Sequence, residues 1–279
     1  MNPLKLSVVL SVQQARFDAI VFKGNLAGNL AKIAGWGYDG VELAIRDPQA
    51  VDVEALVHLA ASYGLAVPAI GTGQAWGDEH LSYSDPDAVV RRSAIERTKA
   101  HVPLAHRLSA TIIVGLLRGL VQPGVSQAQA MAWTVAALSE CCAAAATSGV
   151  RIALEPINRY ETTLINNVAQ GLDLIDRVGA DNLGLLFDTF HANIEEPSFE
   201  DSLIAAGDRL FHFHVADSNR WYPGAGHLDF AHILGVLSRI DYRGFVSGEF
   251  MPRPEADTAA RRAIENLRSL DRDRASGCS

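Results

Sequence analysis

The chain has 279 residues, of which 48% are hydrophobic, and this is enough to bury one large core in a single domain. Its formal net charge is −8 at pH 7 and it has no cluster of Lys and Arg, which argues against nucleic acid as a partner because binding to phosphates requires clustered cations. The N-terminal segment MNPLKLSVVLS has no signal-peptide pattern, and no apolar run approaches the roughly 20 residues that span a bilayer, so we expect a cytoplasmic protein without membrane association.

Short β-branched or apolar segments alternate along the chain with longer amphipathic segments rich in Ala and Leu. We expect eight strands, at residues 4–11, 40–45, 66–73, 110–117, 151–157, 183–190, 209–217 and 244–250. The helices between them include residues 52–63, 87–107, 126–147 and 167–178, and each of these four begins with Asp, Ser or Asn, which favour the N-cap position. This alternation is typical of repeated βα units on a parallel sheet.

Eight βα units in a chain of this length predict a single (β/α)₈ TIM barrel over residues 1–279, with its active site at the C-terminal ends of the strands. The main alternative is a doubly wound open sheet, but no G-x-G-x-x-G motif follows the first strand and nothing marks a break between two domains. The ending DRDRASGCS predicts a disordered tail over about residues 270–279. Cys141 and Cys142 are adjacent and so lack the spacing of metal ligands, and Cys278 lies in a polar tail. We therefore expect all three to be reduced thiols without a functional role.

Four consecutive strands in the second half of the chain end in residues that can bind a metal ion, namely Glu155, Asp188, His214 and Glu249. Because the C-terminal ends of barrel strands surround one point, these side chains are expected to converge. Without a cation, three gathered carboxylates would repel one another. Three carboxylates and one imidazole suit Mn²⁺, Co²⁺ or Mg²⁺ better than a structural zinc site, so we predict one divalent ion, preferably Mn²⁺. His212, one layer deeper on the same face, is expected to be structural.

Polar residues that follow these strand ends predict the walls of a pocket. Glu161, His191 and Arg220 lie in the loops after three of the strands and would surround whatever the ion binds. Each of them is also compatible with a loop salt bridge or a cap. In the segment GTGQAWG, Trp76 is expected to give the pocket an apolar wall, although a tight turn that glycine permits is the alternative.

These residues and their spacing resemble the ketose 3-epimerases of the xylose isomerase-like barrels, typified by D-tagatose and D-psicose 3-epimerases. In that family the metal ligands Glu, Asp, His and Glu end strands five to eight, and a loop Glu, a His and an Arg contact the substrate. The residues that match them in order are Glu155, Asp188, His214, Glu249, Glu161, His191 and Arg220. A still closer resemblance, to a 5-keto-L-gluconate epimerase type that acts on a keto sugar acid, is carried by FKGNL, IRDP, AIGTGQAW, GLLRG, EPINRYET, DTFHANIEE and HFHVADSNRWYPGAGHLDF.

The resemblance implies an epimerase that inverts the carbinol carbon next to a ketone, either C3 of a ketose or C4 of a 5-keto-hexonate. The cation would polarise the carbonyl and stabilise a cis-enediolate. Glu155 and Glu249 would be ligands and also the two acid/base groups on opposite faces of that carbon. Glu161 would orient Glu155 or the substrate, while His191 and Arg220 would donate hydrogen bonds to the developing oxyanion.

Three alternatives stay open at this point. Hydroxypyruvate isomerase, or another aldose–ketose isomerase, uses a similar barrel and the same enediolate chemistry. A nuclease of the endonuclease IV type shares the barrel but needs several zinc ions and a basic surface, which an acidic chain with one strand-end histidine does not offer. A non-catalytic sugar-binding barrel that depends on metal would differ from an enzyme by the absence of hydrogen exchange into a ketose.

A keto sugar acid needs a cation for its carboxylate, preferably a guanidinium. Arg118, after the fourth strand, is the stronger candidate, and Arg46, after the second, is the other. A surface ion pair, such as one between Arg46 and the adjacent Asp47, is the alternative for each. The expected partner is a small sugar or keto sugar acid. The sequence does not define the oligomeric state, for which a homodimer or a homotetramer is the expectation.

Overall fold

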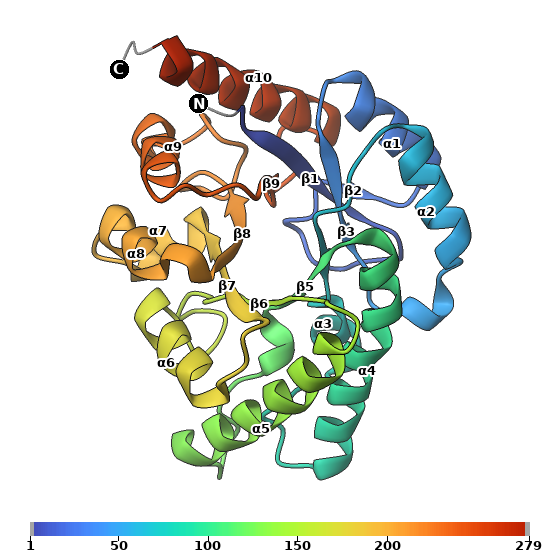
Figure 1. The fold of residues 1–279 in the computed structure, drawn as a ribbon, viewed down its shortest axis with the longest axis vertical. Helices are drawn as coiled ribbons and strands as arrows, with labels where there is room; N and C mark the ends of the chain where they lie inside the picture. Colours follow the sequence, from blue (N-terminus) through green and yellow to red (C-terminus); the bar gives the residue numbers. More distant parts are fainter. Residues whose placement is uncertain (1–2, 277–279) are drawn as a thin grey trace.

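The computed structural model describes residues 3–276, with side chains through residue 274, and forms a closed barrel of parallel strands surrounded by helices (Figure 1). The barrel strands follow one another in chain order, and pairing of the last strand with the first closes the barrel. They are β1 (Lys5–Ser11), β3 (Gly40–Ala44), β4 (Ala69–Gly71), β5 (Thr111–Val114), β6 (Ile152–Leu154), β7 (Leu183–Asp188), β8 (Leu210–Val215) and β9 (Phe245–Gly248). An unpredicted strand β2 (Phe22–Lys23) pairs with the end of β1. The predicted (β/α)₈ fold is confirmed.

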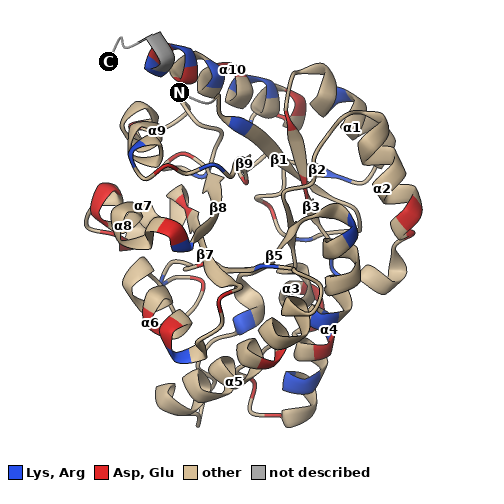
Figure 2. Ribbon diagram, viewed as in Figure 1, with Lys and Arg blue, Asp and Glu red and all other residues tan. Residues whose placement is uncertain are grey.

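The helices around the barrel are α1 (Leu26–Gly35), α2 (Val53–Ser62), α3 (Gln74–Glu79), α4 (Ala88–Leu108), α5 (Gln127–Ala146), α6 (Val168–Val178), α7 (Thr189–Glu195), α8 (Phe199–Ala206), α9 (Phe230–Arg239) and α10 (Ala256–Ser276). Short 3₁₀ helices lie at η1 (Pro48–Ala50), η2 (Leu116–Arg118) and η3 (Gly207–Arg209). Acidic and basic residues are interspersed along the outer helices (Figure 2).

The four helices expected from the sequence are capped by the residues that predicted them. The side chains of Asp52, Asp87, Ser126 and Asn167 each accept a hydrogen bond from a backbone N–H in the first turn of α2, α4, α5 and α6. A cap of this kind typically stabilises a helix by about 1 kcal/mol. The caps therefore explain why the starts of these helices could be located from the sequence.

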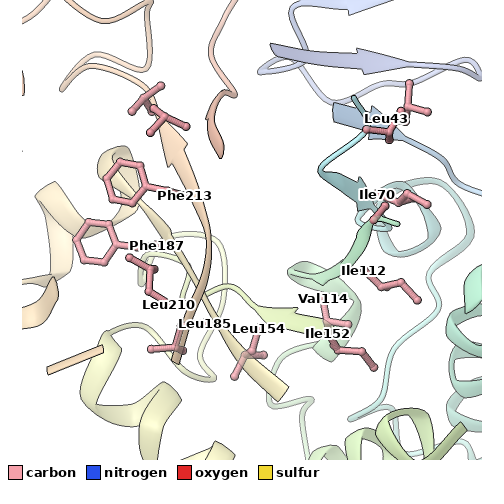
Figure 3. Packing of buried hydrophobic residues seen from close by; sticks show 14 of the residues in the cluster. Leu43, Ile70, Ile112, Val114, Ile152, Leu154, Leu185, Phe187, Leu210 and Phe213 are labelled. Atoms are coloured by element: carbon pink, nitrogen blue, oxygen red, sulfur yellow. The ribbon is translucent and has the colours of Figure 1, made fainter. Parts of the chain in front are cut away.

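The main hydrophobic core lies between the strands and the helices. Side chains such as Leu185 and Phe187 point outward from the barrel (Figure 3), and Phe187 stacks on Phe213 with 5.5 Å between ring centroids. The alternating residues point into the barrel, where a separate small cluster comprises Ala69, Ile113, Ala153 and Leu186. Leu186 pairs with His212 and Asp188 with His214 in the register of β7 and β8, so this cluster forms the apolar layer beneath the strand ends.

The last helix corrects the expected tail. Helix α10 continues to Ser276, so residues 270–276 are helical instead of disordered. Asp271 is buried, and its Oδ2 accepts a hydrogen bond of 3.0 Å from the backbone N–H of Leu4, which ties the helix to the start of the chain (Figure 1). Cys141 and Cys142 are free thiols buried in α5, and Cys278 lies outside the described residues.

Candidate active site and metal centre

The four predicted metal ligands meet at the C-terminal end of the barrel. They follow or end four successive strands: Glu155 after β6, Asp188 in β7, His214 in β8 and Glu249 after β9. The Nδ1 atom of His214 lies 3.6 Å from Asp188 Oδ2, 3.8 Å from Glu249 Oε2 and 3.9 Å from Glu155 Oε1. One ligand atom from each residue lies within 4.8 Å of the others. The structure thus brings the whole predicted set together.

The ligand atoms of this cluster fit a divalent cation. Nδ1 of His214, Oδ2 of Asp188 and Oε1 of Glu155 are buried and have no hydrogen-bond partner. Buried polar atoms without a partner are rare in proteins because they lose the hydrogen bonds that water would give them. Three carboxylates and one imidazole are a ligand set that suits Mn²⁺, Mg²⁺ or Co²⁺. A cation among them would satisfy all three atoms, so the cluster is a candidate metal centre.

Burial and neighbouring charges shift the protonation of these carboxyls in opposite directions. Burial raises the pKa of Glu155 well above its usual range, and the nearby carboxylate of Glu249 raises it further. Burial also raises the pKa of Glu249, to about 7. Burial acts in the same sense on Asp188, but attraction by His191 and His214 outweighs it and holds the pKa of that carboxyl low. Without a cation, burial favours the protonated forms of Glu155 and Glu249, whereas a bound cation would favour their ionised forms.

His191 and Glu161 are joined by Asn158, which the sequence analysis did not identify. The side-chain amide of Asn158 donates to Glu161 Oε1 at 2.9 Å and to His191 Nδ1 at 2.7 Å. Because Nδ1 accepts this bond, the network assigns the imidazole proton to Nε2, which lies 3.8 Å from Glu155 Oε1. Burial lowers the pKa of His191 to about 4, so the ring is neutral at pH 7. The place of Asn158 between the two glutamates of EPINRYET is the signal that identifies it.

Arg220 is held beside the carboxylates by contacts from both halves of the barrel. Its Nη1 donates to Glu161 Oε1 at 2.9 Å, and its Nη2 lies 3.8 Å from Glu249 Oε2. The guanidinium carbon lies 4.9 Å from the ring centroid of Phe17 and 4.7 Å from that of Phe190. Burial lowers the pKa of Arg220, but the carboxylates of Glu249 and Glu161 more than offset this, so the group stays charged.

The loop that carries Arg220 is organised by a buried aspartate. The side chain of Asp217 accepts hydrogen bonds from the backbone N–H groups of Ser218, Gly224 and Leu228. A Cβ atom at Gly226 would lie 2.3 Å from Asp217 Oδ1, so this position has room only for glycine. The glycines of the GAG segment, residues 224–226, therefore allow the loop to pack against Asp217. Arg220 itself has a φ of +61°, which non-glycine residues rarely adopt.

A further buried carboxylate faces the ligand cluster from the other side of the barrel and was missed in the sequence. Glu42 lies inside β3 and is 1% exposed, and its Oε2 lies 2.7 Å from His212 Nε2 and 3.0 Å from His214 Nε2. Burial raises the pKa of Glu42, but the two histidines outweigh it and hold the pKa below the usual range. The sequence signal for Glu42 is a charged side chain inside the apolar run GVELAI.

The site opens into a cavity of about 270 Å³, which is the size of a small-molecule pocket. Trp76 lines this cavity from α3, where an apolar wall was expected, and other apolar side chains on the first-half side include Val9, Phe17, Ile20 and Ala44. Gly115 also lines it, and a Cβ atom there would lie 2.6 Å from Glu155 Oε2. The absence of a side chain at Gly115 leaves space for the Glu155 carboxylate.

The position of Arg118 does not support its expected role in binding a substrate carboxylate. The side chain is fully buried and donates to three backbone carbonyls, those of Gly115 at 2.8 Å, Leu164 at 2.8 Å and Ile165 at 2.9 Å. Ile165 has a φ of +58°, an unfavourable conformation for a β-branched residue. Arg118 therefore stabilises the loop after β6. Its Nε, Nη1 and Nη2 groups all donate to backbone carbonyls.

Arg46 forms an ion pair, as the alternative expected, but with different partners. It pairs with Glu79 at 3.1 Å and with Asp78 at 3.6 Å, and not with Asp47. Arg16, which the sequence analysis did not consider, lines the cavity, and its Nε lies 3.6 Å from the same Asp78. The first-half rim therefore presents arginines that are already paired with acids.

Comparison with known proteins agrees with this geometry. Residues 30–270 match the family described as xylose isomerase-like TIM barrel. The chain is 36% identical over 239 residues to an L-ribulose 3-epimerase of Methylomonas sp. (strain DH-1), a match that covers 83% of this chain and 82% of that protein. It is 33% identical over 232 residues to an L-ribulose 3-epimerase of Mesorhizobium japonicum, covering 81% and 76%. The crystal structure of a D-allulose 3-epimerase from Methylomonas sp. in complex with D-allulose matches with a TM-score of 0.81 at 28% identity, over 97% and 98% of the two chains.

The chain belongs to the xylose isomerase-like TIM barrel family. Its relatives include ketose 3-epimerases, and the chain is an enzyme of the isomerase class, a carbohydrate epimerase. The narrower resemblance to a 5-keto-L-gluconate epimerase type stays a prediction. Within residues 3–276, no helix combines the length and the hydropathy needed to cross a membrane.

Proposed function

We propose that the chain is a divalent-metal-dependent ketose 3-epimerase, which inverts C3 of a free ketose. The observation that carries the proposal is the buried cluster of Glu155, Asp188, His214 and Glu249, whose ligand atoms lie within 4.8 Å of one another. The names of the relatives, L-ribulose 3-epimerase and D-allulose 3-epimerase, support the same reaction. We take Mn²⁺ as the preferred ion because the ligands are mostly carboxylates with one imidazole.

Glu155 and Glu249 are the proposed acid/base pair. A divalent cation bound by the four ligands would polarise the substrate ketone and acidify the neighbouring C–H bond. One carboxylate removes the proton from C3, and the other delivers a proton to the opposite face, so the configuration inverts. Both carboxyls line the cavity beside the ligand cluster, which supports their access to a substrate bound there.

Three polar residues position the substrate oxygens around this pair. His191 donates from Nε2, since its Nδ1 accepts from Asn158. Arg220 donates from its guanidinium, which Glu161 fixes through a 2.9 Å ion pair. Glu161 also accepts from Asn158, so one carboxylate positions Arg220 directly and His191 through the amide. These donors are placed to stabilise negative charge that develops on the substrate oxygen.

The charges around the cavity favour a neutral ketose over a keto sugar acid. Arg118 is committed to backbone carbonyls, and Arg46 is paired with Asp78 and Glu79. Arg16 lines the cavity but already lies 3.6 Å from Asp78. A substrate carboxylate would have to compete with Asp78 for a solvent-exposed guanidinium, whereas a neutral hydroxyl chain needs no such partner.

The test is a metal-dependence and hydrogen-exchange experiment. Protein stripped with EDTA is incubated in D₂O with free ketopentoses and ketohexoses, with a keto-hexonate and with hydroxypyruvate, before and after addition of Mn²⁺, Co²⁺ or Mg²⁺. We expect no turnover in the stripped protein, recovery with metal, and one deuteron at the inverted C3 of a ketose. Full activity without metal would refute the metal centre, and an aldose product would indicate an aldose–ketose isomerase. Inversion at C4 of the keto-hexonate alone would favour the sugar-acid type, and sugar binding without exchange would indicate a binding protein.

A further inference from the structure

We propose that Glu42 is a positioning residue for the metal centre: it holds the single proton of His214 on Nε2 and thereby leaves Nδ1 free to bind the cation. The inference rests on the proposed metal centre and deepens it, because it assigns a role to a carboxylate that is not itself one of the four ligands. Glu42 lies on β3, across the barrel from the strand that carries His214.

The two ring nitrogens of His214 face different partners. Nδ1 faces the three ligand carboxylates at 3.6 to 3.9 Å. Nε2 lies 3.1 Å from Oε1 and 3.0 Å from Oε2 of Glu42. A neutral imidazole carries one proton, and a carboxylate can only accept, so hydrogen bonding to Glu42 requires the proton on Nε2. A histidine that binds a metal commonly has its other nitrogen oriented in this way by a carboxylate.

His212 gives Glu42 a second donor and fixes its orientation. His212 Nε2 lies 2.7 Å from Glu42 Oε2, and the rings of His212 and His214 lie 5.2 Å apart at an interplanar angle of 79°. All three side chains are at most 2% exposed, so water does not compete for these hydrogen bonds. The carboxylate therefore accepts from both histidines in a closed environment, and its position determines that of the His214 ring.

Glu42, His212 and His214 also have ligand atoms close enough to one another to hold a cation themselves. The distances argue for hydrogen bonds instead, because 2.7 to 3.1 Å between nitrogen and oxygen is the normal range for N–H···O bonds. In addition, His214 could bind cations through both nitrogens only if its ring lost its last proton. A second ion at this place is therefore an outcome for the experiment to exclude.

The experiment compares Mn²⁺ binding by EDTA-stripped wild type, Glu42→Gln and His212→Gln, using titration calorimetry. Glutamine keeps the size of Glu42, but it is neutral and has an amide nitrogen, which only donates, in place of one carboxylate oxygen, so it is a weaker acceptor for His214 Nε2. We expect one ion per chain and an affinity about 10- to 100-fold weaker in Glu42→Gln. His212→Gln is the comparison, because it leaves the bond between Glu42 and His214 in place, and its affinity should fall by a smaller factor than that of Glu42→Gln.

A second measurement does not depend on the variant folding. In ¹⁵N-histidine spectra of the Mg²⁺-loaded wild type, His214 should be the tautomer with its proton on Nε2. Unchanged affinity in a folded Glu42→Gln protein, or a proton on Nδ1, would overturn the inference and leave the metal centre intact. Two ions in wild type and one in Glu42→Gln would replace it with a second metal site. A wild type that binds no ion would overturn the metal centre itself, and this inference with it.

Discussion

The two halves of the barrel divide the work of the site. Strands β6 to β9 each place a candidate metal ligand at their C-terminal end. Glu161, His191 and Arg220 follow three of these strands, with His191 in helix α7. Strands β1, β3, β4 and β5 contribute mainly apolar wall, and their one carboxylate at the cluster, Glu42, contacts histidines instead of joining the ligand set. In the proposed mechanism the second half performs the chemistry, while the first half shapes the pocket and supports the ligands.

The strongest test of this division is loss of a proposed acid/base group. Glu249→Gln and Glu155→Gln should each lower the rate of epimerisation by about 10²- to 10⁴-fold, because each change removes a proton-transfer group and weakens the metal centre. Turnover at saturating Mn²⁺ measures the effect, and exchange of the C3 hydrogen with D₂O shows which half-reaction is lost.

The control for these variants comes from the first half of the barrel. Trp76→Phe keeps an aromatic wall and should change the rate at saturating substrate by less than about threefold. A Glu249→Gln enzyme with near wild-type turnover would remove Glu249 from the mechanism. A loss in Trp76→Phe as large as that in the glutamate variants would end the proposed division between the two halves.

A second prediction concerns Arg118, the buried arginine of η2. Arg118→Ala leaves three buried carbonyls without their donor, so the free energy of unfolding should fall by about 3 kcal/mol. Denaturant unfolding measures this loss. At a temperature where the variant is folded, the KM for a neutral ketose and for a keto-hexonate should change by the same factor, because Arg118 binds neither. A selective loss for the acid would restore Arg118 to the substrate site.

The chemistry of the second half was accessible to sequence analysis because its residues obey a positional rule. An acid or an imidazole that ends an apolar run lies, in a parallel barrel, at the point where the strands converge. Glu155, Asp188, His214 and Glu249 follow this rule, and their convergence could be deduced without coordinates. Asn158 does not, because its importance comes from contacts to two side chains whose positions depend on the folded loops.

The predictions that were wrong, for Arg118 and for the C-terminal tail, share one physical cause. In both cases the structure depends on contacts between residues that are distant in the sequence. The sequence places Arg118 after a strand, but it does not show that the loop after β6 turns its carbonyls toward that arginine. The expected tail is helical in its first part, and a contact between Asp271 and Leu4, 267 residues apart, holds it. Strand ends were also extended too far, since β6 has three residues where seven were predicted.

A third prediction uses the raised pKa values of the acid/base pair. A cation binds the ionised carboxylates, so protons must leave when the ion binds below the pKa of Glu249, about 7, or below the raised pKa of Glu155. The apparent Mn²⁺ affinity should therefore rise as the pH increases from 5.5 through 7, by up to about tenfold per pH unit for each proton released. Calorimetry in two buffers of different ionisation enthalpy counts the protons.

The Glu249→Gln variant is the control for this pH dependence. Its affinity should be weaker at every pH, and the number of protons released near pH 6 should fall by about one, because the variant has no carboxyl at this position. A pH-independent affinity in wild type, without proton release, would show that Glu249 and Glu155 are already ionised at pH 6.

The smallest expected effect concerns selectivity at the first-half rim. Arg16 lines the cavity but is largely exposed and lies 3.6 Å from Asp78, and an exposed pair of this kind contributes at most about 1 kcal/mol. Arg16→Gln should therefore change the KM for a neutral ketose by less than about threefold. Arg46→Gln is the matched control, because Arg46 contacts the same Asp78 at the same distance. If a keto-hexonate were the natural substrate, Arg16→Gln would raise the KM for the keto-hexonate by tenfold or more, whereas Arg46→Gln would not. That result would show that the first half of the barrel determines the substrate class. Equal, small changes for both variants and both substrates would leave a neutral ketose as the substrate that fits this pocket.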